Sequence, residues 1–267
     1  KTYNFICPIA KKKKKFSKFL RGFIFKHNIN FVFPLSEHEQ DVLALEKKFY
    51  EKRNVKLIIS NKEIIDICKN KIKTYKFLKK NNIKFPKIIA AKDVDKNFPV
   101  LVKEIKGSGS KNQILINDKN MNILRFKKEI FFQKYLKYQE YGMDILNDYD
   151  GNFLHFAVKK KLLMRSGDTD RAMIVNPKKF LHLAKTISKN LKHVGNLDVD
   201  FLLNKNTTYV LDLNPRFGGG YPFTHEYGYN YIESLILKLQ NKKIKLKFKR
   251  YKKQYSLFSN GITIYKH

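Results

Sequence analysis

The sequence lacks several features that would assign it to a familiar class. No apolar run approaches the roughly 20 residues that span a bilayer. The start, KTYNFICPIAKKKKK, has neither the apolar core nor the small-residue cleavage site of a signal peptide, and the missing initiator Met indicates a fragment or a trimmed form. Its two cysteines, Cys7 and Cys68, form no disulfide framework and no metal-type spacing. These absences favour a cytoplasmic protein with no membrane partner.

Acidic residues are also few, with 23 Asp and Glu against 56 Lys and Arg, which gives a formal net charge of +33. Such a charge favours nucleic acid or another anionic partner. However, Lys greatly outnumbers Arg, and Lys, Asn, Ile, Phe and Tyr are enriched together along the whole chain. A nucleic-acid surface concentrates Arg and Lys on one element. The charge is therefore better explained by compositional bias, and nucleic acid is the less favoured partner.

Hydrophobic periodicity predicts alternating helices and strands in a chain long enough for a sizeable core. In the first 60 residues it predicts strands at 3–9, 29–35 and 55–60 and helices at 16–28 and 36–53, with Ser36 as an N-cap. Further along it predicts two helices and an extended segment within 61–87, strands at 98–105, 114–117 and 129–136, a hairpin at 140–165, a helix at 177–191, a hairpin at 195–216 and a helix at 231–241.

The segment YVLDLNPRFGGGYPF, residues 209–223, carries the most specific pattern. Alternate residues of a strand face the same side, so Asp212, Asn214 and Arg216 point together. Asp200 lies twelve residues earlier on the partner strand. Two carboxylates and an amide oxygen suit Mg²⁺, which proteins commonly bind through nucleotide phosphates. Arg216 could then stabilise charge on a phosphoryl group. The simpler alternative is a solvated polar face.

Two weaker patterns precede it. In FPVLVKEIKGSGSKNQ, Lys103 lies on a predicted strand, and a Gly–Ser loop follows that could cover a phosphate. The loop lacks the Gly-Lys-Ser/Thr of a Walker A motif, and a plain hairpin turn is the alternative. In FFQKYLKYQEYGMD, an extended connector could offer backbone groups to an adenine, with Glu140 near the ribose. Alone, this segment is indistinguishable from an ordinary strand.

Together these three motifs resemble those of ATP-grasp enzymes, particularly carbamoyl-phosphate synthase large subunits and biotin carboxylases, over roughly residues 1–260. The resemblance implies an α/β (α+β grasp) fold. It places a partial Rossmann-like pre-ATP-grasp domain at 1–66 and a two-lobed ATP-grasp domain at 67–267. Lobe A covers about 67–135 and lobe B about 136–267. The first strand and helix of the usual leading domain are missing.

The resemblance also implies roles for individual residues. The nucleotide-binding set is Lys71, Lys103, Gly107, Ser108, Gly109, Ser110, Gln133, Lys134, Tyr135, Leu136 and Glu140. The ligands of two Mg²⁺ or Mn²⁺ ions are Asp200, Asp212 and Asn214, and the catalytic residues are Arg216 and Lys103. Weaker substrate candidates are Arg165, Arg171, Gly219 and His225. One residue departs from the family pattern: Asn70 replaces an Asp that usually precedes the lysine, here Lys71. We expect this change to loosen the start of the helix that begins there.

The function that the resemblance implies is an ATP-dependent ligase. A carboxylate would be activated as an acyl phosphate by Mg-ATP and joined to an amine, both substrates being small molecules, and the enzyme could form a homodimer. Three alternatives remain open: a carbamoyl-phosphate synthase-like or carboxylase-like subunit acting on bicarbonate, a basic nucleic-acid-binding protein, and a degenerate domain that binds nucleotide without chemistry. We expect the glycines after Arg216 to leave room for the acceptor substrate.

Overall fold

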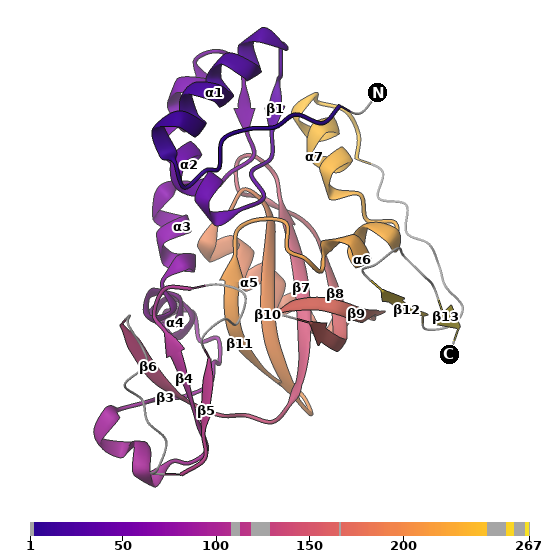
Figure 1. Cartoon of the computed structure of the whole chain (residues 1–267). Helices are drawn as coiled ribbons and strands as arrows, with labels where there is room; N and C mark the ends of the chain where they lie inside the picture. The colour runs from indigo at the N-terminus through magenta and orange to yellow at the C-terminus, as the bar shows by residue number, and fades with distance from the viewer. Residues whose placement is uncertain are drawn as a thin grey trace.

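A computed structural model describes residues 3–107, 113–118, 129–165, 167–244, 255–258 and 265–266. Within these ranges the strands form a two-stranded, a four-stranded and a seven-stranded sheet (Figure 1). Among the described helices, none combines the length and the apolar character needed to cross a membrane. The Gly–Ser loop residues Ser108, Gly109 and Ser110 lie outside the described residues.

The N-terminal part consists of α1 (Lys13–Lys26), β1 (Phe31–Val32), α2 (Glu37–Glu51) and β2 (Lys56–Leu57), with β1 and β2 parallel. Ser36 caps α2 as predicted, since Glu39 N donates to its hydroxyl at 3.3 Å and Glu39 Oε2 accepts from Ser36 N at 3.0 Å. The strand predicted at 3–9 is wrong: this segment has no regular secondary structure, and Ile6 is 97% exposed. A strand forms only against a partner, and in the described residues β1 pairs with β2 alone.

The next part packs two helices against a small antiparallel sheet. Its elements are α3 (Lys62–Lys69), α4 (Lys71–Lys80), β3 (Ile88–Ile89), the 3₁₀ helix η1 (Ala91–Lys96), β4 (Val100–Glu104), β5 (Ile114–Ile116) and β6 (Ile130–Lys134), with strand order β3-β6-β4-β5. Contrary to the expectation of a loosened helix, Asn70 caps α4, because its side-chain oxygen accepts from Lys73 N at 3.0 Å. An amide oxygen therefore replaces the carboxylate without loss of the cap.

The large sheet contains both predicted hairpins. Its strands are β7 (Gln139–Asn147), β8 (Phe153–Arg165), β9 (Asp168–Val175), β10 (Gly195–Asn204), β11 (Thr207–Asn214), β12 (Tyr255–Phe258) and β13 (Tyr265–Lys266), in the order β11-β10-β7-β8-β9-β12-β13. The associated helices are η2 (Lys178–Phe180), α5 (Leu181–Leu191), α6 (Tyr221–Glu226) and α7 (Tyr231–Leu239). The sequence analysis did not predict β9 or α6.

Side chains alternate between the two faces of this sheet. The face packed against α5 is apolar and buries Met143, Ile145, Val158, Leu197, Val199 and Phe201. We call this the apolar face. The opposite side, here called the polar face, carries Glu140, Gly142, Asp144, Lys159, Lys161, Asn196, Asp198, Asp200, Asp212 and Asn214. On β11, Leu213 lies in the core as predicted, whereas Leu211 is only half-buried.

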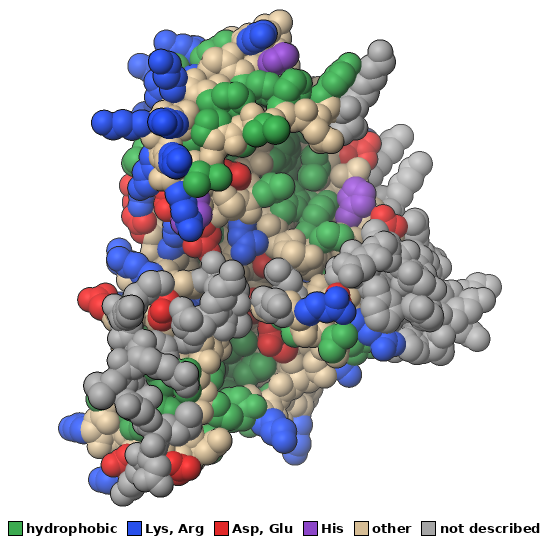
Figure 2. All heavy atoms as spheres, in the orientation of Figure 1, with side chains coloured by type: hydrophobic (Ala, Val, Ile, Leu, Met, Phe, Trp, Pro, Cys, Tyr) green, Lys and Arg blue, Asp and Glu red, His purple; other side chains and the backbone are tan. Residues whose placement is uncertain are grey.

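Basic side chains are widely distributed on the surface. On the face shown in Figure 2, Lys and Arg side chains are scattered along the left and lower edges and are densest over α1 and α2. Three members of the lysine run 11–15 lie in the first turn of α1, and the whole run is exposed. Such a spread is typical of a biased composition rather than of a single binding stripe.

Candidate functional site

The two predicted metal-ligand carboxylates meet across a hairpin. Asp200 on β10 is the direct cross-strand partner of Asp212 on β11, and Asp198 is the partner of Asn214. The side chains of Asp200 and Asp212 are 24% and 25% exposed. Directly opposed carboxylates repel each other unless cations lie between or beside them. This part of the polar face therefore needs nearby positive charge to offset the repulsion between the two carboxylates.

Two lysines supply that charge. Lys71, at the first position of α4, places Nζ 2.5 Å from Asp212 Oδ1. Lys161 on β8 places Nζ 2.5 Å from Asp200 Oδ1 and 2.7 Å from Glu140 Oε1. Burial lowers the pKa of Lys161, but Asp200 and Glu140 outweigh it and hold that pKa above its ordinary value. The sequence analysis missed Lys161, although its position in the run Lys159–Lys161 faces the site.

Lys103 approaches the same carboxylates from the small sheet. It lies on β4 and is 3% exposed. Burial lowers its pKa, and the nearby negative charge of Asp212 acts in the opposite direction. Lys71 N also donates to Ile105 O at 2.9 Å, which fixes the start of α4 against the end of β4. The structure thus brings Lys71, Lys103, Glu140, Asp200 and Asp212 together, from five different elements.

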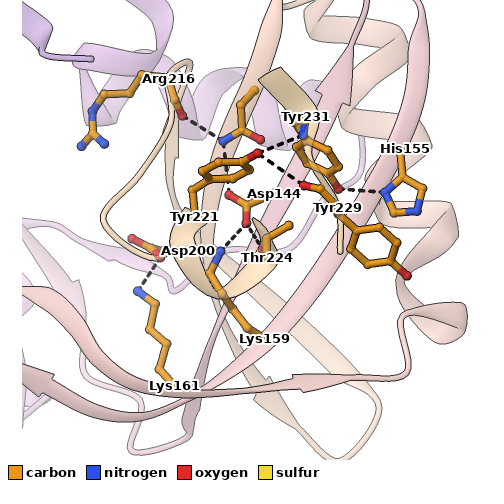
Figure 3. A network of polar contacts seen from close by, with 11 residues as sticks. Asp144, His155, Lys159, Lys161, Asp200, Arg216, Tyr221, Thr224, Tyr229 and Tyr231 are labelled. Atoms are coloured by element: carbon orange, nitrogen blue, oxygen red, sulfur yellow. Dashed lines mark hydrogen bonds and ion pairs between the residues drawn. The ribbon is translucent and has the colours of Figure 1, made fainter. Parts of the chain in front are cut away.

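A second ion pair lies deeper in the polar face. Lys159, 1% exposed, pairs with the fully buried Asp144, which also accepts from the Thr224 hydroxyl at 2.5 Å (Figure 3). Asn196 donates to Asp144 Oδ1 at 3.2 Å and to the backbone oxygen of Arg216 at 3.1 Å. Every charge in this network therefore has a partner, as burial requires. Sequence reasoning missed it, because only the cross-strand register shows which residues meet.

A glycine makes room for the lysines. Gly142 lies on β7 beside Lys159, and a Cβ at this position would lie 3.0 Å from Lys159 Cε and 3.5 Å from Lys161 Cε. Lys159 can therefore reach Asp144 on β7, and Lys161 can cross β7 to reach Asp200 on β10. No sequence motif predicts this requirement.

The glycines that follow β11 allow a close backbone approach. A Cβ at Gly218 would overlap the Asp198 carboxylate, and one at Gly220 would lie 2.6 Å from Lys159 Cε. We call residues 217–220 the glycine turn. Gln40 of α2 donates to the carbonyl of Pro215 at 2.6 Å, just before this turn. The glycine turn therefore lies against the polar face, and the residue two positions before it is bonded to the N-terminal part of the chain.

These residues surround one pocket. Its lining comes from the N-terminal helices, the end of β4, the tip of the β8–β9 hairpin, the polar face and the glycine turn. It includes Glu37, Gln40, Cys68, Lys69, Lys71, Gly107, Lys159, Lys161, Gly167, Thr169, Asp198, Asp200, Asp212, Leu213, Asn214, Pro215, Arg216, Gly219 and Gly220. Cys68 belongs to the hydrophobic core and is 7% exposed.

Asp198 was not predicted as a site residue. It lies two residues before Asp200 on the same face of β10. Burial, followed by the negative charge of Asp200, raises its pKa above the usual range for a carboxyl group. The spacing Asp198-Val199-Asp200 is a signal that could have identified it.

The remaining predicted residues lie in different surroundings. Gln133 is 1% exposed and donates to Tyr75 Oη at 2.9 Å and Pro86 O at 3.3 Å, so its side chain joins β6 to α4 and to the segment before β3. In the connector, Lys134 is exposed, and Tyr135 and Leu136 are half-buried.

The weaker substrate candidates are scattered. Arg165, with a side chain 66% exposed, pairs with Asp170 at 3.0 Å. Arg171 lies on β9. His225 is exposed on α6, with Nδ1 3.5 Å from Tyr221 Oη. Of these candidates in the described residues, only Gly219 lines the pocket.

The family model for the ATP-grasp domain matches residues 68–220, more than half of the chain. The chain belongs to the ATP-grasp family. The predicted family and fold class are thus confirmed. The ATP-grasp match ends at the last residue of the glycine turn, so it spans the strands of the site described above.

Two curated relatives and one solved structure illustrate the similarity. A carbamoyl phosphate synthase large chain of Pseudothermotoga lettingae is 22% identical over 200 residues, covering 65% of this chain but 18% of the relative. Tyramine–L-glutamate ligase of Methanocaldococcus jannaschii is 22% identical over 248 residues, covering 90% of this chain and 72% of the relative.

The similar solved structure is that of the biotin carboxylase domain dimer of Hydrogenobacter thermophilus 2-oxoglutarate carboxylase, in complex with MgADP, ADP and bicarbonate. It has a TM-score of 0.71 and 12% identity, and the match covers 91% of this chain and 61% of that chain.

Proposed function

We propose that this ATP-grasp chain is an ATP-dependent ligase that activates a carboxylate as an acyl phosphate and joins it to an amine. The observation that carries the proposal is the meeting of Asp200, Asp212, Lys71 and Lys161 in one pocket beside Arg216. Alternating acids and lysines can hold both the metal ions and the phosphates of a nucleotide. The name of the M. jannaschii relative, which joins an amine to an amino acid, supports this reaction class.

The donor set fits magnesium. In the described residues, no group of three or more His, Cys, Asp and Glu side chains is arranged to hold a metal by itself. Asp200, Asp212 and Asn214 instead offer two carboxylates and an amide oxygen on one face, which suits ions that also bind phosphate oxygens. Mg²⁺ or Mn²⁺ held there would neutralise negative charge on the phosphoryl group being transferred. We propose two such ions.

The chain's own cations have roles in phosphoryl transfer. A carboxylate oxygen of the acid attacks the γ-phosphorus, and the bond from that phosphorus to the oxygen bridging to ADP breaks. Lys103 and Arg216 are fixed positive groups beside the charge that develops. Lys71 and Lys161 now pair with the metal-ligand carboxylates and would become available to phosphate oxygens. The amine nitrogen then attacks the acyl carbon, phosphate leaves, and the nitrogen loses a proton.

The remaining predicted nucleotide contacts extend this proposal. Backbone groups of residues 134–136 would meet the adenine, Glu140 the ribose, and the segment 107–110 the phosphates. We propose the division into a partial leading domain at 1–66 and an ATP-grasp domain at 67–267, supported by the separate hydrophobic cluster around Phe16, Leu43 and Tyr50. A homodimer is a further proposal, and the solved structure cited above is a domain dimer.

Calorimetry of ATP binding, with Mg²⁺ and with excess EDTA, tests the site. We expect micromolar affinity that requires Mg²⁺ and falls at least tenfold in Asp212→Ala, because that change removes one metal ligand. Asp95→Ala, which removes an exposed charge on η1, is the matched control. Binding that is indifferent to Mg²⁺ or to Asp212 would contradict the proposal, and the net charge of +33 would then direct attention to nucleic acid.

Bicarbonate is the second candidate substrate. Two observations favour it: the relative in Pseudothermotoga lettingae is a carbamoyl phosphate synthase large chain, and the H. thermophilus structure contains bicarbonate. ADP release in bicarbonate-depleted buffer distinguishes the two candidates. Release that depends on an organic acid supports the ligase, whereas release that depends on added bicarbonate supports the alternative.

A further inference from the structure

Most acidic side chains that line the pocket have a cationic partner, and one does not. Asp200 pairs with Lys161 and Asp212 pairs with Lys71 at 2.5 Å each, and Glu37 lies 4.0 Å from Lys69 Nζ. Asp198 is the exception. In the part of the chain that the structure describes, its carboxylate makes no hydrogen bond and no ion pair, although it lines the same pocket.

Asp198 lies between the polar face and the glycine turn. Its cross-strand partners are Asn214 on β11 and Asp144 on β7, and its carboxylate lies against Gly218 with too little space for a Cβ. Lys159 is near but pairs with Asp144, and Lys161 is near but pairs with Asp200 and Glu140. The two neighbouring ammonium groups are therefore already engaged. A carboxylate kept in a pocket without its own cation is costly unless a ligand supplies one.

Arg216 is the complementary case. Its Nη1 donates to Phe217 O at 3.0 Å, and among the described residues its guanidinium forms no ion pair with a carboxylate. Figure 3 shows this guanidinium pointing away from the Asp144 network. Both lie near Asn214: Arg216 follows it by two residues, beyond the end of β11, and Asp198 is its cross-strand partner. The pocket thus presents one carboxyl group and one guanidinium that form no ion pair with any of the described residues.

We propose that Asp198 binds the protonated amino group of the substrate whose carboxylate reacts beside Arg216, so that the acid activated here is an amino acid. This inference rests on the proposed function and specifies its substrate class. An ammonium group would donate hydrogen bonds to Asp198, while the reacting carboxylate lies near Arg216 and the γ-phosphate. Acids without an amino group would leave Asp198 without a partner and would bind more weakly.

The test separates acid activation from the identity of the acceptor. Hydroxylamine serves as the nucleophile and converts an acyl phosphate into a hydroxamate with release of phosphate. Wild-type protein is assayed with Mg-ATP and pooled amino acids, then with single amino acids and their deaminated analogues, such as glutamate and glutarate. We expect hydroxamate from an amino acid at least tenfold more efficiently than from its deaminated analogue. Equal rates with both would overturn the inference, and this comparison requires no variant.

Asp198→Asn provides the second readout, since it keeps the size of the side chain and removes its charge. We expect the KM for the amino acid to rise 10- to 100-fold, while the KM for ATP changes by less than about threefold. Asp95→Asn, a charge-matched change on η1, should leave both KM values as in the wild type. An unchanged amino-acid KM in Asp198→Asn would overturn the role of this residue.

Failure of the proposed function gives a different result. If no acid and no bicarbonate yields hydroxamate or ADP although Mg-ATP binds, the ligase proposal fails. Calorimetry of the amino-acid pools in the presence of MgADP then decides the inference by itself. Binding by the wild type that is lost in Asp198→Asn supports it, and absence of binding by the wild type overturns it.

Discussion

The two faces of the large sheet are built from the same strands, yet different forces stabilise them. On β10, Leu197 and Val199 are fully buried in the apolar face, whereas Asp198 and Asp200 alternate with them on the polar face. Burial alone stabilises the first pair. The polar face is stable only because its charges are matched across strands, as Lys159 is with Asp144.

The two faces differ in how they tolerate substitution and in whether they line the pocket. A side chain of the apolar face can be replaced by another of similar volume at modest cost. A charge of the polar face cannot be removed without leaving its partner unpaired in a poorly solvated site. The polar face is therefore the more fragile of the two, and it is also the face that lines the pocket.

The largest expected effect comes from breaking the buried pair. Lys159→Met leaves Asp144 buried without its ammonium partner, and we expect the free energy of unfolding to fall by about 4 kcal/mol. Urea denaturation measures this change. The double variant Asp144→Leu, Lys159→Met should recover more than half of the loss, because no unpaired charge remains. A double variant no more stable than the single one would show that pairing is not what stabilises this face.

A truncation on the apolar face should cost slightly less. Leu197→Ala removes a fully buried side chain from the cluster that includes Met143 and Ile145, and we expect a loss of about 3 kcal/mol. At temperatures where the variant is folded, its affinity for Mg-ATP should match the wild type, since Leu197 faces away from the pocket. A selective loss of nucleotide affinity would break the proposed separation between the faces.

Acid should weaken the protein through a histidine beside the apolar face. Burial lowers the pKa of His193, which is fully buried, to about 4. Because its ordinary pKa is near 6.5, the unfolded chain binds a proton that the folded chain excludes, so stability falls as pH falls from 6.5 towards 4. At pH 5 the loss from this group is about 2 kcal/mol. The difference between the urea midpoints at pH 7.5 and pH 5 should be smaller in His193→Gln than in the wild type. An equal difference in the two proteins would contradict the assignment.

An exposed ion pair should matter least. Lys62 and Asp66 pair within α3, with side chains 36% and 43% exposed. We expect Lys62→Ala to change the free energy of unfolding by less than about 0.5 kcal/mol, because solvent screens the interaction. Because both pairs join a lysine to an aspartate, the difference in stability loss between Lys62→Ala and Lys159→Met measures the effect of burial. A loss above about 2 kcal/mol in Lys62→Ala would contradict this expectation.

Periodicity alone was enough to predict much of the fold. The alternation of apolar residues predicted both hairpins, and Ser36 with Glu39 marked the start of α2. The segment 3–9 was wrongly predicted because a strand depends on a neighbouring edge, which a local pattern does not contain. The predicted metal set lies on one hairpin, where spacing directly indicates a shared face.

The polar network was beyond sequence reasoning for a different reason. Lys161 reaches Asp200 across β7, so this pair depends on the order of three strands, whereas Lys159 meets Asp144 through the pairing of β8 with β7. Gly142 has a role only once both lysines are placed above it. Residues that act across strands distant in sequence leave no local spacing to recognise, whereas Asp198 did leave one beside Asp200.

The bond from Gln40 to the carbonyl of Pro215 joins residues 175 positions apart, one in each of the proposed domains. It bears on how such a chain can evolve. A leading segment exchanged with that of a paralogue would bring a different side chain to the strand that carries Asp212 and Asn214. Recombination at the proposed boundary near residue 66 would therefore change the contacts at the end of β11 without changing any residue in that strand, and we expect the two segments to be inherited together.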